Sequence, residues 1–536
     1  MKILKTLSII LVMTLMLSAC GVALKGSDYT AVEIVLDDEK ITVDGKDADG
    51  NSDNAVYVAN DIIYYESGKD FKYGEGDEND AHTAEEAAKH TVVHITKAGR
   101  YALSGKLSFG QIAIDLGKNA SEDTEAVVTL ILDGIDVTCT VAPAVIFYNV
   151  YECGSTDEEK ATKDVDLTNA GANVLIPDGT VNTVNGSYVA RIYKPDSVVL
   201  SEDGTKVEDA KKLHKYDGAF YSKMSMSVGG GKKNTGVLNI NAENEGLDSE
   251  LHLGLYGGNI NINSGNDGIN TNEDGISVTE VNGANLKICV TGETGEGDGI
   301  DSNGWLVINK GTVIAEACSK SADSGIDSDN GIYINGGTVI ATGSMLDRIE
   351  DGGQTYSVFS FAEKQSKNAP IFLKDKDGNI VFSHTPNNDF SNIIFSSPDL
   401  KEGTYTLWSG ENQLEGQKGN TPGGMGRPNM MPGGERPDGE MPENFNPFEN
   451  MTPPDLDNRP EMPEGVTPPD FEAGATMPNE NKKPDGTTPP DFNGRPDGNK
   501  FNPNDNFGGA SGEKSTEFEI TKGSNTFSSV SAVSVK

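Results

Sequence analysis

One short phrase of acidic, amide and glycine residues returns four times in the middle of this chain. Its copies are Glu245-Gly-Leu-Asp-Ser249, Asp267-Gly-Ile-Asn-Thr271, Asp298-Gly-Ile-Asp-Ser302 and Ser324-Gly-Ile-Asp-Ser328. The glycines of successive copies are 22, 31 and 26 residues apart. Carboxylate and amide oxygens are the ligands that Ca²⁺ prefers, so the phrase is a candidate for metal binding.

Equivalent positions of the copies would stack about 4.8 Å apart if each copy lay on its own strand. Two carboxylates at that distance repel by roughly 3–4 kcal/mol at an effective dielectric near 20, which a bound cation would relieve. The alternative is that the acids are solvated turn residues, chosen because Asx and Gly favour turns. The repetition favours at least one weak calcium site, with Kd on the order of 10⁻⁴–10⁻³ M. The predicted ligands are Glu245, Asp248, Asp267, Asn270, Asp298, Asp301, Asp327 and Asp329.

A strand-like run precedes each copy of the phrase: 237–240, 259–262, 285–288 and 312–315. Repeats of this length cannot bury an apolar face alone and must stack on their neighbours. Period-two alternation with Gly and Asx corners favours parallel β-structure over helical repeats. The predicted fold class is all-β: a right-handed parallel β-helix, or solenoid, with a C-terminal antiparallel cap and a long disordered insertion.

Composition limits the partners of this chain. It has 536 residues, 63 of them Gly, with 35% hydrophobic residues and a formal net charge of −40. Such acidity argues against nucleic acid, whose phosphates attract basic surfaces. It also argues against binding anionic lipid by charge.

The first twenty residues have the features of a leader peptide. Lys2 and Lys5 precede an apolar run at 9–17 that is too short to span a bilayer comfortably. Leu17-Ser-Ala-Cys20 resembles a bacterial lipobox, which predicts lipidation of Cys20; the alternative is an ordinary secretory signal. We expect an exported protein held by its lipid on the outer face of the bacterial cytoplasmic membrane and exposed at the cell surface.

Four further cysteines leave the redox state open. Cys139, Cys153, Cys289 and Cys318 permit two disulfides in an exported chain, but free thiols are an equal alternative. Aligning the runs at 285–288 and 312–315 puts Cys289 opposite Glu316, so Cys289 and Cys318 are out of register.

Residues 415–513 differ in character from the rest. They are rich in Gly, Pro, Asn, Asp and Met, and repeat Thr-Pro-Pro-Asp three times. Such sequence buries too little apolar area to offset its ordering entropy and is predicted to be disordered, either as a spacer or as a tolerated expansion. Strand-like sequence returns at 518–521 and 527–533, which suggests that the segment is inserted within the cap.

The repeats and their flanks together resemble a known family. Asp217-Gly-Ala-Phe-Tyr-Ser222 opens the array, Gly336-Gly-Thr-Val-Ile340 follows its last corner, and the outer matches are 95–105 and 396–403. This pattern, over most of 30–410 and the final strands, resembles a clostridial family of carbohydrate-binding β-helix proteins. The resemblance implies calcium binding, a fold similar to pectate lyases, and binding of polygalacturonate and cellulose-like glycans. Insertions at 65–89, 154–173 and 194–214 depart from the family and leave the binding face open.

The expected division of the chain follows from these segments. Residues 1–20 are the lipoprotein signal peptide, 21–29 a tether, 30–414 the carbohydrate-binding β-helix with its cap, 415–513 the disordered segment, and 514–536 strands that rejoin the cap. We expect a monomer.

Three functions remain open at the level of sequence. The first is calcium-dependent, non-catalytic binding of an acidic plant cell-wall polysaccharide, with the aromatic rings of Trp305, Tyr256 and Tyr333 as stacking candidates. The second is a polysaccharide lyase, which needs a base beside the metal; Arg348 is the candidate, although a surface ion pair is the more ordinary role for it. The third is a structural spacer of the cell or spore surface.

Overall fold

The computed structural model describes residues 31–419 and 513–533. The predictions for the leader, the tether, the lipidation of Cys20 and most of the Pro-rich segment fall outside these described residues. Among the described residues, no helix has the length and apolar character that crossing a bilayer requires.

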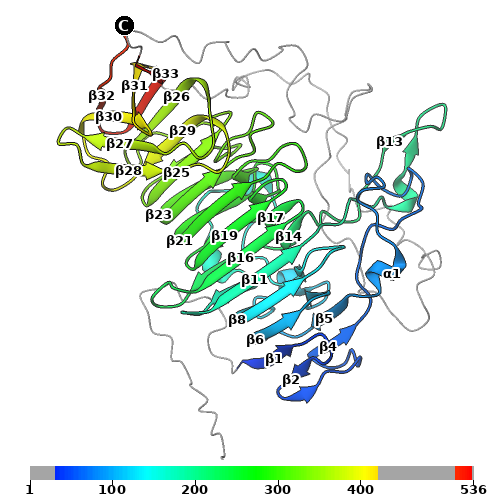
Figure 1. Ribbon diagram of the computed structural model, residues 1–536. Helices are drawn as coiled ribbons and strands as arrows, with labels where there is room; N and C mark the ends of the chain where they lie inside the picture. Colours follow the sequence, from blue (N-terminus) through cyan, green and yellow to red (C-terminus); the bar gives the residue numbers. More distant parts are fainter. Residues whose placement is uncertain (1–30, 420–512, 534–536) are drawn as a thin grey trace, which may run out of the picture.

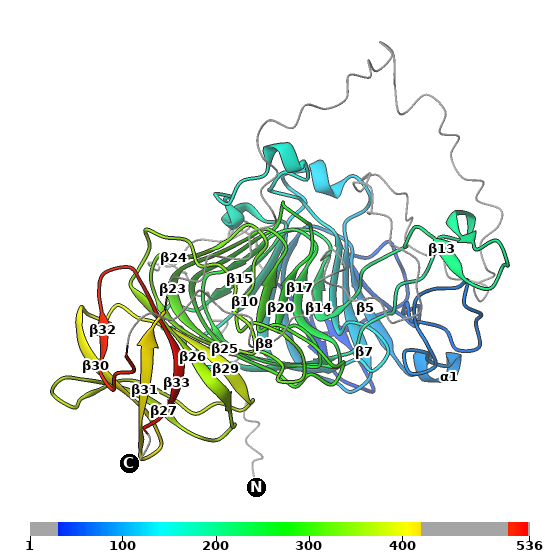
Figure 2. The same cartoon turned by 90° about the horizontal axis from the view of Figure 1, so that it is seen from above.

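One sheet of eight short strands forms a wall of the molecule (Figure 2). All its neighbouring strands pair in parallel except the first two, β4 and β5, which are antiparallel. In spatial order the strands are β4 (Val56–Ala59), β5 (Thr91–Ile95), β7 (Gly110–Asp115), β9 (Val145–Asn149), β14 (Gly218–Ser222), β17 (Glu245–Ser249), β20 (Ile269–Thr271) and β22 (Ile300–Ser302).

A second sheet of 23 strands surrounds the rest of the core. Its strands alternate: in β16, Leu238 and Ile240 are buried while Asn239 and Asn241 face outward. The parallel strands stack in rows along the molecule (Figure 1). They are β1 (Val32–Leu36), β6 (Gly99–Leu107), β8 (Val128–Thr138), β10 (Ala172–Ile176), β11 (Val181–Gly186), β15 (Met226–Gly230), β16 (Val237–Ala242), β18 (Leu253–Leu255), β19 (Asn259–Ser264), β21 (Val278–Val290), β23 (Trp305–Glu316), β24 (Ile332–Ile334) and β25 (Thr338–Gly343).

Strands that pair in antiparallel fashion, with one parallel pair among them, extend this sheet at both ends of the molecule (Figure 1). At the C-terminal end they enclose a second core, in which the rings of Phe359, Phe518 and Phe527 lie 5.0–5.3 Å apart. The strands there are β26 (Tyr356–Gln365), β27 (Ile371–Asp375), β28 (Ile380–His384), β29 (Phe390–Ser396), β30 (Gly403–Ser409), β31 (Asn412–Lys418), β32 (Phe518–Ile520) and β33 (Ser524–Ala532); at the other end are β2 (Thr42–Val43) and β3 (Lys46–Asp47).

Some long strands continue through positions at which the residue types favour a turn. Asp133-Gly134 is a turn signal by residue type, yet β8 runs through it and pairs with β10 by its first half and with β11 by its second. Gly134 takes a positive φ of 84°, and the side-chain oxygen of Asn182 accepts from the N–H groups of Gly134 and Ile135, so the strand bends without ending.

The expected fold class is corrected by this arrangement. The all-β character is confirmed, but the parallel strands close around one core as a barrel, with further strands outside it. An open right-handed parallel β-helix solenoid is therefore wrong, whereas the antiparallel strands expected at the C-terminal end are present. Corner signals in the sequence mark where a strand bends, and they do not tell whether its hydrogen bonding stops there.

The insertions lie beside the sheets (Figure 1). The insertion at 65–89 contains α1 (Ala84–Ala87), which begins with a capping box between Thr83 and Glu86. Residues 187–217 include η4 (Pro195–Ser197) and the hairpin β12 (Val199–Leu200) and β13 (Val207–Asp209); the other short helices are η1 (Ala120–Glu122), η2 (Glu158–Lys160) and η3 (Leu167–Asn169).

The four described cysteines are free thiols. Cys139 and Cys318 are buried, whereas Cys153 and Cys289 are half-buried. Cys289 pairs with Glu316 between β21 and β23, as the sequence register predicts.

Candidate functional site

The repeated phrase places one column of oxygen ligands on the eight-stranded sheet. In β17, β20 and β22, Asp248 pairs with Asn270, and Asn270 pairs with Asp301. Their neighbours Leu247 and Ile300 point into the core, so alternation puts the three polar side chains on the opposite face of the sheet. Asp248 and Asn270 are nevertheless buried, because the flanking segments cover this face.

A second column begins three residues earlier in each copy, with Glu245, Asp267 and Asp298. Two of its carboxylates accept backbone hydrogen bonds from the next layer: the N–H of Asp298 donates to Asp267 Oδ1 at 2.7 Å, and the N–H of Ser324 donates to Asp298 Oδ1. The amide of Asn270 links the columns by donating to Glu245 Oε1 at 3.0 Å. The two columns therefore form one acidic cluster.

The glycine of the phrase is required by close packing between layers. A Cβ at Gly268 would lie 2.1 Å from Cγ2 of Ile288 and 2.6 Å from the carbonyl oxygen of Gly299. Both contacts are shorter than van der Waals distance, so only glycine lets the layers approach to hydrogen-bonding distance here.

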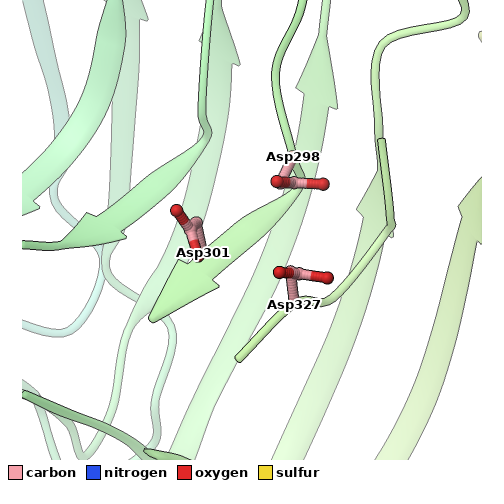
Figure 3. Close-up of side chains that lie close together, drawn as sticks. All are labelled: Asp298, Asp301 and Asp327. Carbon is pink, nitrogen blue, oxygen red and sulfur yellow. The ribbon is translucent and has the colours of Figure 1, made fainter. Parts of the chain in front are cut away.

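Three carboxylates of the cluster come closest together. Asp298, Asp301 and Asp327 are half-buried, and one oxygen of each lies within 4.8 Å of the others. Figure 3 shows their carboxyl groups around a common space. Asp329, which the sequence groups with them, is exposed and is not part of this triad.

Several polar atoms of the cluster are buried without a hydrogen-bond partner among the described residues. They are Oε2 of Glu245, Oδ2 of Asp248 and Oδ1 of Asn270. These side chains are 6%, 0% and 6% exposed. A buried acceptor that makes no hydrogen bond costs about 1–3 kcal/mol, and more if it is charged, so these oxygens call for a cation or a proton.

The pKa values in the cluster also show that its carboxylates are buried without enough compensating charge or hydrogen bonding. Burial, followed by repulsion from Asp217, raises the pKa of Glu245 to about 8. Burial and then neighbouring carboxylates raise the pKa of Asp248, Asp267, Asp298 and Asp301 well above the usual range for an aspartate. A bound divalent ion would reverse this effect, because it stabilises the ionised form.

Two cations reach the cluster from neighbouring segments. Arg191 Nη2 lies 3.1 Å from Asp217, and Lys215 Nζ lies 3.5 Å from Glu273. Each is already engaged by a carboxylate, so neither offsets the charge of the central triad.

The residues present fit a hard divalent cation. The donors are oxygens of Asp, Glu and Asn, with no thiol or imidazole in the triad, which matches Ca²⁺ rather than Zn²⁺. The predicted residues Glu245, Asp248, Asp267, Asn270, Asp298, Asp301 and Asp327 all belong to this one cluster. Their role as ligands stays a prediction.

The predicted stacking residues lie elsewhere, on the larger sheet. Trp305 begins β23 opposite Val278, and Tyr333 lies in β24 with Lys163 Nζ 5.6 Å from its ring centre. Tyr256 follows β18, and its hydroxyl donates to Glu280. All three rings are half-buried.

Arg348, the candidate base, is exposed and paired. Its Nε lies 2.6 Å from an Oε of Glu350, and Nη2 donates to the carbonyl of Asn330 at 3.4 Å. Arg348 therefore forms a surface ion pair, which is the alternative to a catalytic role given in the sequence analysis.

Sequence reasoning omitted some members of the cluster. Asp217 carries the same Asp-Gly signal, and Gly218 pairs with Glu245, so it could have been included. Arg191, Lys215 and Asp347 come from segments outside the repeat and carry no periodic signal. Asp347 accepts from the N–H of Ser328 and is found only from the structure.

A family model for "Carbohydrate-binding domain-containing protein" matches residues 89–366, just over half of the chain. The chain belongs to this family. The match includes both columns of the acidic cluster, and it confirms the carbohydrate-binding part of the resemblance stated above. A comparison with curated proteins finds no match.

One solved structure is similar to this member of the carbohydrate-binding family. It is described as the polysaccharide lyase-like protein from C. thermocellum, in a gadolinium derivative. The similarity covers 60% of this chain and 98% of that one, with 20% sequence identity and a TM-score of 0.31. Two folds are not equated at such a score, so the expected likeness to pectate lyases is not confirmed.

Proposed function

We propose that this protein binds an acidic plant cell-wall polysaccharide, polygalacturonate or pectin, through Ca²⁺ held at the acidic cluster. Membership of the carbohydrate-binding family supports the polymer as partner. The observation that carries the calcium is the triad Asp298, Asp301 and Asp327 beside buried carboxylate oxygens that make no hydrogen bond among the described residues.

Charge explains why a metal would be needed. A chain with a net charge of −40 and a polymer of uronates repel each other in the absence of a cation. Ca²⁺ takes six to eight oxygen ligands, so an ion bound by the triad keeps positions for carboxylates of the polymer. The same ion would relieve repulsion within the protein and between protein and polymer.

The cellular setting belongs to the same proposal. The leader and Cys20 support an exported protein that touches the membrane only through a lipid anchor. A monomer on a surface tether would hold the polymer close to the cell.

Binding without catalysis is favoured over lyase activity because Arg191, a cation beside the acidic cluster, is held in its charged form. Burial lowers the pKa of Arg191, but the adjacent Asp217 more than offsets this, so the pKa is raised overall. A guanidinium held more firmly in its charged form is a poorer base for removing the proton α to a uronate carboxylate.

Retention on immobilised polygalacturonate tests the proposal, with the mature chain in calcium and in excess chelator. We expect retention in calcium, loss in chelator, and no ultraviolet-absorbing unsaturated product. Undiminished retention in chelator would contradict the calcium bridge, and unsaturated product would assign a lyase. No retention in either condition would leave a structural spacer.

The Asp298→Asn variant should lose retention. Asp377→Asn, at an exposed turn between β27 and β28, is the matched control and should behave like the parent chain.

A further inference from the structure

The insertion at residues 187–217, called the strap below, is fixed beside the acidic cluster. Arg191 lies on the middle one of three segments that pair in antiparallel fashion. On one side, the N–H of Glu75, from the insertion that contains α1, donates to the carbonyl of Arg191 at 2.9 Å. On the other side, Tyr193 forms an antiparallel bridge with Lys212. Figure 2 shows β13 of the strap and α1 on the same side of the molecule. Hydrogen bonds on both edges therefore fix the backbone that carries Arg191.

The strap brings two cations against buried carboxylates. Arg191 Nη2 lies 3.1 Å from Asp217 Oδ2, and the two side chains are 24% and 12% exposed. Lys215 Nζ lies 3.5 Å from Glu273 Oε1, and these side chains are each 17% exposed. Both pairs are largely withdrawn from water, so their charges are screened less than charges at an open surface.

Both cations act on more of the cluster than the carboxylate with which each one pairs. Burial and then Asp217 raise the pKa of Glu245, and Arg191 acts in the opposite direction. Burial and then neighbouring carboxylates raise the pKa of Asp248, and Lys215 acts against them. Glu245 and Asp248 are also the two acids whose buried oxygens make no hydrogen bond among the described residues. The strap cations thus reach the part of the cluster that hydrogen bonding leaves unsatisfied.

The central triad lies at the other end of the cluster from the strap. Asp217 precedes β14, and Glu245 begins the neighbouring strand β17. Asp298 precedes β22, which also contains Asp301 and lies two strands beyond β17. There burial and then neighbouring carboxylates raise the pKa of both aspartates. The chain therefore supplies cations at one end of the cluster, and the need for a further cation is greatest at the other end.

A cation that is part of the chain differs from a bound ion in two ways. It is present at every calcium concentration, because a guanidinium stays protonated and cannot dissociate from the fold. It therefore stabilises buried carboxylates in the calcium-free chain. The same positive charge repels a divalent ion that binds to the cluster, so it lowers the affinity for that ion.

We propose that the strap is a built-in counter-ion that sets the calcium threshold of the acidic cluster: Arg191 and Lys215 stabilise the cluster without calcium and weaken its binding of calcium. The proposal rests on the calcium binding of the proposed function and adds a regulator to it. Such a chain can fold before it meets calcium, and it binds the ion only where calcium is abundant.

Calorimetric titration of the folded chain with calcium tests this role. Arg191→Met removes the charge and keeps a long apolar side chain. It should bind calcium at least about five-fold more tightly than the parent, which is the lower end of ordinary coupling between two sites. In chelator it should melt below the parent, because buried Asp217 loses its partner.

Two further variants separate charge from packing. Arg191→Lys keeps the charge and should bind calcium like the parent chain. Lys212→Met is the matched control, since it removes a strap cation that lies 3.2 Å from Glu75 of the other insertion, and it should leave the calcium affinity unchanged. If Arg191→Met does not fold, Lys215→Met replaces it with the same expected gain in affinity.

The parent chain reports on the proposed function, and the difference between the variants reports on the strap. Calcium binding by Arg191→Met that is no tighter than that of the parent would overturn the counter-ion. Equal tightening in Arg191→Lys or in Lys212→Met would also overturn it, because packing rather than charge would then be the cause. Binding by Arg191→Met alone would contradict the proposed function and support the counter-ion, and binding by neither would contradict both.

Discussion

Replacing Asp301 by Asn tests the acidic cluster most directly. The substitution keeps the shape of the side chain, and the preceding strand already carries Asn270 at the paired position, so the fold accepts an amide there. What changes is one full charge among three carboxylates that lie within 4.8 Å.

The size of the effect follows from Coulomb's law. Two unit charges about 4 Å apart interact by about 4 kcal/mol at an effective dielectric of 20. Removing one carboxylate from a bound calcium ion, which carries two charges, loses attraction of at least that order. Part of this loss is offset because the pKa of Asp301 is raised, so the parent chain must remove a proton from Asp301 before it can bind the ion, and the Asn variant need not. The net loss should be about 2–3 kcal/mol, which weakens calcium binding roughly 30- to 150-fold.

The sign of the effect on stability should depend on calcium. In chelator, Asp301→Asn removes repulsion and should melt a few degrees above the parent chain. In excess calcium the parent gains stability by mass action while the variant gains much less, so the order should reverse.

Thermal melts of both proteins with calcium and with chelator measure this crossing, and Asp377→Asn serves as the control at an exposed turn. If Asp301→Asn gains as much from calcium as the parent, Asp301 is not a ligand. If calcium does not raise the melting temperature of the parent, the cluster does not bind calcium and the electrostatic reasoning is refuted.

Three further predictions follow from the described residues. In chelator, the melting temperature should fall as pH rises from about 7.5 to about 8.5. Burial and then a neighbouring carboxylate raise the pKa of Glu245 to about 8, so in this window the folded state still holds a proton that the unfolded state has already lost. His214 and His252, whose pKa burial lowers to about 4, are neutral in both states above about pH 7.5 and add no slope there. Excess calcium should abolish that slope, and a slope unchanged by calcium would contradict the prediction. Gly268→Ala should lower the free energy of unfolding by about 1–3 kcal/mol in a denaturant titration, because the added Cβ would lie 2.6 Å from the backbone carbonyl oxygen of Gly299. The control Gly50→Ala, whose Cβ would lie 3.5 Å from its nearest neighbour, should leave the free energy of unfolding unchanged. Equal denaturation midpoints for the two variants would refute the packing argument. Phe359→Ala should lower the free energy of unfolding by about 3–5 kcal/mol in the same denaturant titration, because it leaves a cavity in the second core. A loss below about 1 kcal/mol would show that this core contributes little to stability.

The acidic cluster was largely predictable because its residues repeat in register. Aligning the phrases on glycine placed Asp248, Asn270 and Asp301 in one column, and the strands pair in that way. The same alignment placed Cys289 opposite Glu316 correctly. Period-two alternation is a local property, so it is readable from one chain.

The closed arrangement of the parallel strands was not predictable from the same signals. Asp133-Gly134 is a turn signal by residue type, but the buried amide of Asn182, a residue almost fifty positions away, satisfies the backbone there and lets β8 continue. The cations beside the cluster were missed for a similar reason. Arg191 and Lys215 belong to an insertion whose path depends on tertiary contacts rather than on any repeat.

The pairing of Gly416 with Ser515 has a consequence for how this chain tolerates change. Each backbone N–H donates to the carbonyl of the other, at 2.9 and 2.8 Å, and β33 then pairs with β26 and β31. The two ends of the intervening stretch are thus fastened side by side. The entropy of closing a loop grows only logarithmically with its length, by about 0.6 kcal/mol for each doubling. Residues between these two anchor points can therefore be added or lost at little thermodynamic cost to the strands that they connect.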